Sequence, residues 1–241
     1  MDILGIIPAR GGSKGFPKKN TRMVSGKPLI AHTILAAQKS RLITRLTVST
    51  EDEEIAGIAR RYSVEVISRP IELAADDSPI DDALRHAVTY LKEKEGYYPY
   101  IVVQMQANVP IRKEGMIDKV IKKVIDTEAD SAISIYEVDQ RPELTKILDG
   151  DKLRPRCGLP EGYRRQDFPK LYLADGTVMA TKTDVLFRTA GDKRAHAYLG
   201  EDIRGVIQEK YYAIELDSPE DLVLAEAVMS ILDAKKQVDG R

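Results

Sequence analysis

Between Ile3 and Val138, short apolar runs alternate with longer amphipathic stretches, and this alternation leaves few folds open to the chain. Short apolar runs are typical of buried parallel strands, whereas apolar residues three and four apart are typical of helices packed on a sheet. The predicted strands are 3–8, 45–49, 64–67, 100–105 and 131–138. One predicted helix begins near Pro28, and the others cover 51–62, 80–95 and 113–126. The alternation predicts an α/β fold with helices on both faces of a mostly parallel sheet.

The second half of the chain interrupts this alternation. Residues 139–170 contain several prolines and glycines and few apolar side chains. Because strand-like patterns resume at 171–181 and 206–216, residues 139–170 are interpreted as an excursion from the sheet rather than a linker. We therefore expect residues 1–241 to form a single domain with this excursion inserted into it.

Two segments carry helix-start signals. Thr50, with Glu53 three residues later, predicts a capping box at the start of the second helix. Ser218, with Asp221 three residues later, predicts another at the start of the last helix.

Composition argues against two classes of partner. Basic and acidic residues number 37 and 38, whereas nucleic-acid-binding proteins are usually basic. No stretch approaches the roughly 20 apolar residues that a membrane-spanning helix needs. The N-terminus lacks a signal-peptide pattern, and Cys157, the only cysteine, cannot form an internal disulfide. We expect a cytoplasmic protein that binds neither nucleic acid nor membrane.

The loop after the first strand is the most informative segment. Residues 8–20 contain three glycines, no acid and four cations, which are Arg10, Lys14, Lys18 and Lys19. Glycines let backbone N–H groups approach an anion, and Arg and Lys both bind phosphate. Ligands of open α/β sheets bind at the carboxyl ends of the strands, where this loop begins. The loop therefore predicts a polyphosphate site.

Two familiar phosphate motifs do not fit this loop. The P-loop pattern needs Gly-Lys followed by Ser or Thr, which is absent here, and the glycine spacing differs from that of the dinucleotide pattern. From the residues alone, a surface loop with solvated lysines remains the alternative.

A pair of acids precedes the last helix. Glu215 and Asp217 are two residues apart, so in an extended strand both point to one face. Paired carboxylates beside a triphosphate bind Mg²⁺, which prefers oxygen ligands. The plainer alternative is that Asp217 and Ser218 only open the last helix.

The run from Ile6 to Asn20 resembles the opening signature of the acylneuraminate cytidylyltransferase family, the CMP-sialic acid synthetases. The residues that match the signature are Ala9-Arg10, Ser13-Lys14-Gly15 and Lys19-Asn20. Similar segments continue along nearly the whole chain, at 48–51, 69–74, Gln106, Pro110, Arg112, 165–169 and 215–217. The resemblance implies a Rossmann-like fold of the nucleotide-diphospho-sugar transferase type.

The resemblance also implies roles for individual residues. CTP would lie over the first loop, with Arg10 and Lys19 as the catalytic contacts to its triphosphate. The other nucleotide-binding residues that it implies are Ala9, Gly11, Ser13, Lys14, Asn20, Arg69 and Gln106. The acceptor-binding residues would be Arg165, Gln166 and Asp175, and Mg²⁺ would be held by Asp217 and Glu215.

The implied reaction joins CTP to a 3-deoxy-2-keto sugar acid, giving CMP-sugar and pyrophosphate. The excursion at 139–170 would form the acceptor pocket and contact a second subunit of a homodimer. Two alternatives stay open. One is a sugar-1-phosphate nucleotidyltransferase that uses another NTP, and the other is a non-catalytic nucleotide-binding protein on the same fold.

Three departures from the family pattern concern metal binding, base recognition and acceptor recognition. Glu215 stands where the family has Asp, and residues 107–109 read Ala-Asn-Val instead of Pro-Thr-Ser. Residues 175–179 read Asp-Gly-Thr-Val-Met where the family has Asn-Gly-Ala-Ile-Tyr. The sequence therefore leaves open which sugar acid is the acceptor. Legionaminic or pseudaminic acid could take the place of N-acetylneuraminic acid.

Overall fold

The computed structural model describes residues 1–12, 15–139, 142–157 and 168–239, with side chains described as far as residue 235. Its centre is a seven-stranded sheet in the order β11-β7-β10-β6-β1-β4-β5. The strands are β1 (Ile3–Pro8), β4 (Arg45–Thr50), β5 (Glu65–Ser68), β6 (Ile101–Gln104), β7 (Ser131–Glu137), β10 (Tyr172–Lys182) and β11 (Ile203–Ile207). β10 runs antiparallel to both of its neighbours and the other strands share one direction, which confirms the mostly parallel sheet.

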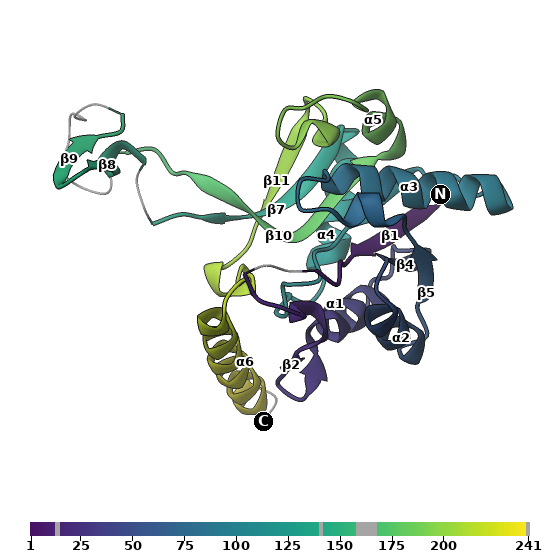
Figure 1. Cartoon of the computed structure of the whole chain (residues 1–241), viewed down its shortest axis with the longest axis horizontal. Coiled ribbons are helices and arrows are strands. Elements are labelled where there is room, and N and C mark those ends of the chain that lie inside the picture. Colours follow the sequence, from purple (N-terminus) through teal and green to yellow (C-terminus); the bar gives the residue numbers. More distant parts are fainter. Residues whose placement is uncertain (13–14, 140–141, 158–167, 240–241) are drawn as a thin grey trace.

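Helices cover both faces of this sheet (Figure 1). The helices are α1 (Leu29–Gln38), α2 (Glu53–Arg61), α3 (Ile80–Glu95), α4 (Met116–Thr127), α5 (Thr183–Arg188) and α6 (Pro219–Asp239). Ile3 and Ile7 of β1 pack in one core with α1, α2 and α4, while Leu4 and Ile6 pack in a second core with α3 and α5. The two cores follow from the alternation of side chains along a buried strand.

A third, smaller core attaches the last helix. The short strands β2 (Met23–Val24) and β3 (Lys27–Pro28) form a hairpin ahead of α1. Val24 and Leu29 pack there against Leu216 and Ala225, so α6 rests on the start of α1. No helix in the described part of the chain is long and apolar enough to cross a membrane.

The segment that leaves the sheet forms a two-stranded arm. β8 (Lys146–Asp149) and β9 (Lys152–Pro155) pair as an antiparallel hairpin, which stands away from the sheet beyond β7 and β10 (Figure 1). Leu148 lies opposite Leu153 in this hairpin, and both side chains are exposed. The arm therefore carries apolar surface that this chain does not cover.

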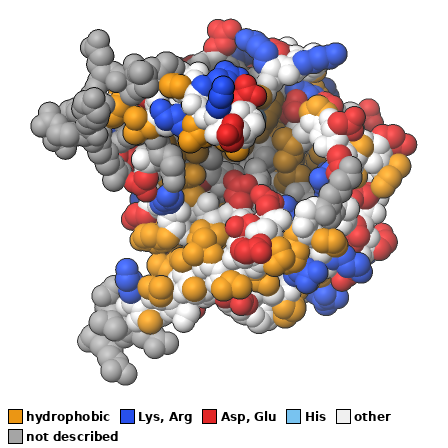
Figure 2. Space-filling model, turned by 60° about the vertical axis from the view of Figure 1, so that its left-hand side comes forward, with side chains coloured by type: hydrophobic (Ala, Val, Ile, Leu, Met, Phe, Trp, Pro, Cys, Tyr) orange, Lys and Arg blue, Asp and Glu red, His pale blue; other side chains and the backbone are white. Residues whose placement is uncertain are grey.

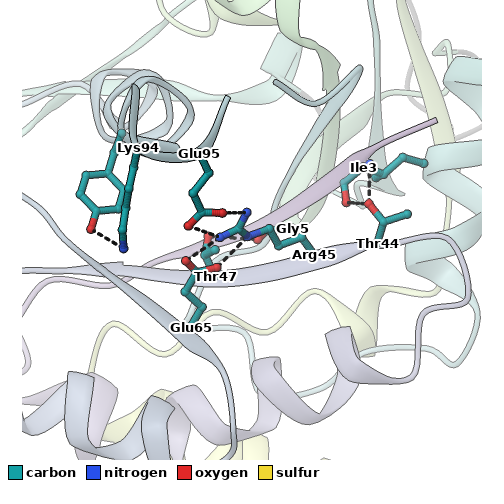
Figure 3. A network of polar contacts seen from close by, with 9 residues as sticks. Ile3, Gly5, Thr44, Arg45, Thr47, Glu65, Lys94 and Glu95 are labelled. Carbon is teal, nitrogen blue, oxygen red and sulfur yellow. Dashed lines mark hydrogen bonds and ion pairs between the residues drawn. The ribbon is translucent and has the colours of Figure 1, made fainter. Parts of the chain in front are cut away.

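An ion-pair cluster fastens α3 to the sheet at the end opposite the strand carboxyl ends (Figure 3). Arg45 donates from Nε and Nη2 to the two carboxylate oxygens of Glu65, at 2.7 and 2.8 Å. Its Nη1 donates to Glu95 at the end of α3, at 2.8 Å. These hydrogen bonds raise the pKa of Arg45 further above its usual range. The cluster ties β4, β5 and α3 together.

Two local predictions from the sequence were wrong and one was confirmed. Asp52, not Thr50, caps α2, because its carboxylate accepts from the backbone N–H of Ile55 at 2.9 Å. Thr50 instead accepts from the backbone N–H of Asp52, and so holds the capping residue. At α6 the predicted capping box is present, since Asp221 accepts from the backbone N–H of Ser218 at 2.8 Å.

The second error concerns the segment ahead of α6. A strand was expected at 206–216, but β11 ends at Ile207 and a short 3-10 turn follows at Lys210–Tyr212. The other 3-10 turns among the described residues are Lys19–Thr21, Ile71–Ala74, Pro142–Leu144 and Ala197–Leu199. Residues 213–217 form no ladder with the sheet, so the acids there are placed by loop contacts instead.

The strand order positions a crevice beside β1. From β1 the chain proceeds to β4 and β5 on one side, and then returns to β6 on the other side. Such a reversal separates the loops that leave the carboxyl ends of the two central strands, and ligands bind in the crevice between them. The loops here are 9–20 after β1 and 105–115 after β6.

Candidate active site

A cavity of about 260 Å³ lies at this reversal point. Its walls come from the loops after β1, β5 and β6, and they include Arg10, Lys19, Asn20, Arg69, Asp76 and Gln106. Figure 2 shows acidic side chains gathered beside a hollow on one face of the molecule. The structure thus brings five of the predicted site residues into one cavity, from segments far apart in sequence.

Arg10 faces this cavity from the carboxyl end of β1. Its Nη1 lies 2.8 Å from a carboxylate oxygen of Asp76 and donates to the carbonyl of Ala75 at 3.3 Å. The backbone carbonyl of Arg10 accepts from the side-chain amide of Asn20 at 2.9 Å. Arg10 is therefore held across the cavity by the segment that follows β5.

Lys19 lies at the opposite end of the loop and reaches the predicted metal-binding acids. Its Nζ is 2.6 Å from Oδ1 of Asp217, and Nδ2 of Asn108 donates to the same oxygen at 3.2 Å. The backbone N–H of Leu216 donates to the carbonyl of Asn108 at 2.8 Å. These contacts join the first loop, the loop after β6 and the segment before α6 at one point.

Asn20 and Gly11 supply polar groups near Arg10. Asn20 is buried, and its Oδ1 is buried without a hydrogen-bond partner among the described residues. An acceptor left unpaired in this way costs free energy unless a ligand donor reaches it. The backbone N–H of Gly11 donates to Glu51 at 2.8 Å, and the buried Ala9 is fixed by its N–H bond to the carbonyl of Ser49.

Arg69 lines the cavity, and its positive charge is paired with the carboxylate of Glu51. Its Nε and Nη2 both lie 2.9 Å from Oε2 of Glu51, and both side chains are buried. The same carboxylate binds Gly11 through its other oxygen. Glu51 therefore couples the phosphate loop to the predicted base-binding arginine.

Gln106 is positioned by a close approach to the turn in β10. Its backbone N–H donates to the carbonyl of Gly176 at 3.2 Å. Gly176 has φ of +65°, and a Cβ there would lie 2.7 Å from the side-chain carbon of Gln106. Only glycine satisfies both conditions, so this turn fixes the amide of Gln106 at the cavity wall.

A buried arginine supports the loop that carries Gln106 and Asn108. Arg112 donates to the carbonyls of Gln106 and Thr177 and to the hydroxyl of Thr33. Burial lowers the pKa of Arg112, and the negative charge of Asp175 opposes this effect. The guanidinium thus connects the base side of the site to the β10 turn.

Asp175, predicted to bind the acceptor, is 1% exposed. One carboxylate oxygen accepts from Ser134 Oγ at 2.5 Å and from the N–H of Thr177 at 2.9 Å. The other accepts from Gln208 Nε2 at 2.5 Å. The structure therefore gives this carboxylate a role in holding the β10 turn, and a direct contact with an acceptor stays a prediction.

Glu215 is half-buried between the other acids. Burial raises its pKa most, and the carboxylates of Asp217 and Asp175 raise it further, whereas Lys19 acts in the opposite sense. The charge of Asp217 raises the pKa of Glu215, so the two carboxylates lie within electrostatic reach of each other, although the segment is not a strand. A cation there would relieve this repulsion.

A larger hollow of about 680 Å³ lies elsewhere, around α5 and residues 189–203. Its arginines are already paired, Arg188 with Asp130 at 2.7 Å and Arg194 with Asp192 at 2.7 Å. It lies outside the strand carboxyl ends where the loop cations gather, so we assign the site to the smaller cavity.

A comparison with known protein families agrees with this geometry. Residues 4–227 match the sequence model of the cytidylyltransferases. The chain belongs to the cytidylyltransferase family.

Several curated relatives of this cytidylyltransferase chain carry more specific names. An N-acylneuraminate cytidylyltransferase of Streptococcus agalactiae serotype V is 30% identical over 228 residues, covering 92% of this chain and 52% of that protein. A CMP-N,N'-diacetyllegionaminic acid synthase of Legionella pneumophila is 27% identical over 236 residues, covering 96% and 97% of the two chains. The chain spans about half the length of the streptococcal relative.

Solved structures share the fold of the family. A CMP-2-keto-3-deoxy-manno-octonic acid synthetase in complex with CTP aligns with a TM-score of 0.72 at 18% identity, over 95% of this chain and 99% of that one. A 4-diphosphocytidyl-2C-methyl-D-erythritol synthase aligns with a TM-score of 0.70 at 14% identity, over 95% and 98%. Likeness at this identity shows the nucleotide-diphospho-sugar transferase type of fold.

Glu215 and Asp217 of this cytidylyltransferase can bind Mg²⁺ if the nucleotide supplies further oxygen ligands. Among the described residues, no group of three or more His, Cys, Asp and Glu side chains is arranged to hold a metal ion. Glu215 and Asp217 nevertheless offer carboxylate oxygens whose repulsion a dication would relieve. Since Mg²⁺ keeps waters and takes substrate phosphate oxygens, two protein carboxylates suffice if the metal arrives with the nucleotide.

Four predicted residues lie outside the described residues, and sequence reasoning missed three others. Ser13, Lys14, Arg165 and Gln166 fall in the segments that are not described. The residues it missed are Glu51, Asp76 and Asn108. Asn108 was visible only as a departure from the family pattern, and Glu51 only as the last residue of the similar segment 48–51. Asp76 carried no signal, because Arg10 is distant from it in sequence.

Proposed function

We propose that this chain transfers CMP from CTP to a 3-deoxy-2-keto sugar acid of the nonulosonic type. The observation that carries the proposal is the cavity at the carboxyl end of β1, which Arg10, Lys19, Asn20, Arg69 and Gln106 all line. The names of the relatives support the nucleotide and the class of acceptor, since they include N-acylneuraminate cytidylyltransferase and CMP-N,N'-diacetyllegionaminic acid synthase.

The nucleotide half of the proposal follows from the polar groups in the cavity. Gln106 offers both a donor and an acceptor to the edge of cytosine, and the unpaired Oδ1 of Asn20 offers an acceptor to a base or ribose donor. Arg69 borders the same space. Arg10 and Lys19 lie on the side of the phosphate loop, where a triphosphate places its negative charge.

In the proposed reaction, the anomeric hydroxyl of the sugar acid attacks the α-phosphorus of CTP. The bond from that phosphorus to the bridging oxygen breaks, and pyrophosphate leaves. Negative charge grows on the phosphate oxygens as the bond breaks, and fixed cations such as Arg10 and Lys19 stabilise that charge more than the ground state. Mg²⁺ bound at Asp217 and Glu215 would supply charge neutralisation on the phosphates.

The acceptor side of the proposal includes a second subunit. The arm with its exposed Leu148 and Leu153 provides apolar surface for a homodimer contact, as expected for the excursion at 139–170. We place the protein in the cytoplasm, which suits a chain whose one cysteine, Cys157, is free and exposed.

Turnover with a panel of substrates tests the proposal. Purified protein is incubated with Mg²⁺, each of the four NTPs, and either a nonulosonic acid or a sugar-1-phosphate, and pyrophosphate and the nucleotide sugar are measured. We expect product only with CTP and a sugar acid. Product from a sugar-1-phosphate would favour the alternative transferase, and binding without any product would favour a non-catalytic protein.

A further inference from the structure

The three described cations of the phosphate loop all contact carboxylates. Arg10 lies 2.8 Å from Asp76, Lys18 lies 3.0 Å from Glu54, and Lys19 lies 2.6 Å from Asp217. The sequence of the loop itself contains no acid. Each carboxylate therefore comes from another segment of the chain. It pairs with a cation that we expect to bind phosphate when the nucleotide is present.

The pair between Arg10 and Asp76 differs from the pair between Lys18 and Glu54 because it stands inside the cavity. Both of its residues line that space, whereas Lys18 and Glu54 line only a small recess behind it. Asp76 belongs to the segment between the 3-10 turn Ile71–Ala74 and α3. An anionic side chain thus projects into a space that must accept a highly charged anion.

We propose that Asp76 competes with the triphosphate for Arg10 and so limits the affinity of the site for CTP. In the ligand-free protein Asp76 holds the guanidinium, and a phosphate oxygen replaces it when a nucleoside triphosphate enters. The proposal deepens the nucleotide site of the proposed function and rests on it. It adds a residue to which no role was assigned.

The exposure of the ion pair between Arg10 and Asp76 favours its replacement by a phosphate contact. The side chains of Arg10 and Asp76 are 36% and 44% exposed, and ion pairs at such exposure contribute little to stability. A triphosphate carries several negative charges and offers Arg10 a stronger partner than one carboxylate. Asp76 then faces like charge and must turn away, so part of the binding free energy is spent on displacing it.

This arrangement makes the affinity depend on the charge of the ligand. A triphosphate can displace Asp76, whereas uncharged cytidine gains nothing from the exchange. Removing the carboxylate should therefore strengthen CTP binding and leave cytidine binding unchanged. If Asp76 instead orients Arg10 toward phosphate, its removal should weaken CTP binding.

Isothermal titration with CTP and with cytidine separates these possibilities. The variants are Asp76→Asn, Asp76→Ser and the control Asp77→Asn, which removes the same charge from the next residue, an exposed one outside the cavity lining. We expect both Asp76 variants to bind CTP about three- to tenfold more tightly than the wild type, and Asp77→Asn to show a clearly smaller gain. In an Arg10→Gln background the gain from Asp76→Asn should be smaller than in the wild type, because the ion pair with Arg10 is then already absent.

The outcomes are distinguishable from failure of the proposed function. A wild-type protein that does not bind CTP overturns the nucleotide site itself. A wild-type protein that binds CTP, combined with Asp76 variants that bind it more weakly or no better than Asp77→Asn, overturns the competition by Asp76 alone. Thermal unfolding of each variant confirms that the folded protein is being measured.

Discussion

At the scale of single residues, the site is assembled by contacts that bridge most of the chain. Lys19 and Asp217 are 198 positions apart, and Arg10 and Asp76 lie in loops after different strands. Lys19 contacts an acid that would bind the metal in the proposed reaction, whereas Arg10 contacts an acid that the triphosphate would displace. The site residues are thus partly neutralised before any ligand arrives.

Substitution of Lys19 tests whether its position, not only its charge, matters. Lys19→Met should lower kcat about 10²–10³-fold, because a fixed cation at the developing phosphate charge is removed. Lys18→Met is the matched control, since Lys18 carries the same charge one residue away but pairs with Glu54 outside the cavity. Steady-state pyrophosphate release measures both. Equal losses in the two variants would mean that only the net charge of the loop counts.

Substitution of Gly176 tests the positioning of Gln106. Gly176→Ala places a Cβ 2.7 Å from the side chain of Gln106 and also strains a backbone at φ +65°. We expect CTP to bind about tenfold more weakly and the protein to lose about 1–2 kcal/mol of unfolding free energy. Gly191→Ala is the control, because Gly191 has φ of +84° but no atom within 4 Å of its Cβ. It should lose stability while CTP binding, measured by titration, stays unchanged.

At the scale of elements, a half-buried histidine makes one helix contact pH-dependent. His32 of α1 bonds the carbonyl of Val24 in β2 at 2.8 Å. Burial lowers its pKa most, nearby Lys27 and Arg112 lower it further, and the bond to Val24 acts in the opposite sense. The unfolded chain therefore takes up the proton at a higher pH than the folded protein does. The stability that depends on neutral His32 is complete above about pH 6.5 and is lost as the pH falls.

The corresponding variant should flatten this dependence. Between pH 7 and pH 5, His32→Gln should lose about 1 kcal/mol less unfolding free energy than the wild type does. Because burial also lowers the pKa of His86, the double variant with His86→Gln should flatten the curve further. Urea unfolding at several pH values provides the measurement. An unchanged slope in His32→Gln would show that this histidine titrates alike in both states.

Elements with strong local patterns were predictable from the sequence. The helix at 80–95 was predicted with its observed bounds, because its apolar face repeats over four turns. The start of α2 was misjudged because Thr50 and Asp52 both can cap, and only the tertiary path decides between them. The strand expected at 206–216 stops at Ile207, because its pairing with β7 ends at Ile135, and nothing in the sequence pattern shows where this pairing ends.

The candidate site could be predicted in part for a similar reason. The phosphate loop is continuous in sequence, so its cations were visible, and the structure places Arg10 and Lys19 in one cavity. Asp76 contacts Arg10, and Glu51 contacts Gly11 and Arg69, in loops that follow other strands, and no spacing rule reveals such contacts. Pairing across the sheet, rather than local pattern, sets these contacts.

At the scale of the whole molecule, the arm carries exposed apolar side chains. Leu148 and Leu153 face each other on the hairpin and are exposed, whereas α6 offers a separate exposed apolar set at Val223 and Leu224. Figure 2 shows a band of hydrophobic side chains across the lower part of one face. Substitutions on the arm and on α6 therefore distinguish which of the two surfaces forms the homodimer contact.

If the arm forms the homodimer contact, Leu148→Asp with Leu153→Asp should convert the dimer to a monomer. The matched pair Val223→Asp with Leu224→Asp on α6 should leave the dimer intact. Light scattering after size-exclusion chromatography measures the mass of each. A monomeric wild type, or dissociation by the α6 pair alone, would contradict the arm as the interface.

The central claim is that one cleft holds the triphosphate between the loop after β1 and the acids before α6. Diffraction from crystals soaked with CTP and Mn²⁺ tests it most directly, because Mn²⁺ can be located by its anomalous signal. The account predicts Mn²⁺ at Asp217 and Glu215, with the phosphates of CTP against Arg10 and Lys19. A triphosphate bound away from these two cations, or Mn²⁺ bound away from both acids, would contradict it.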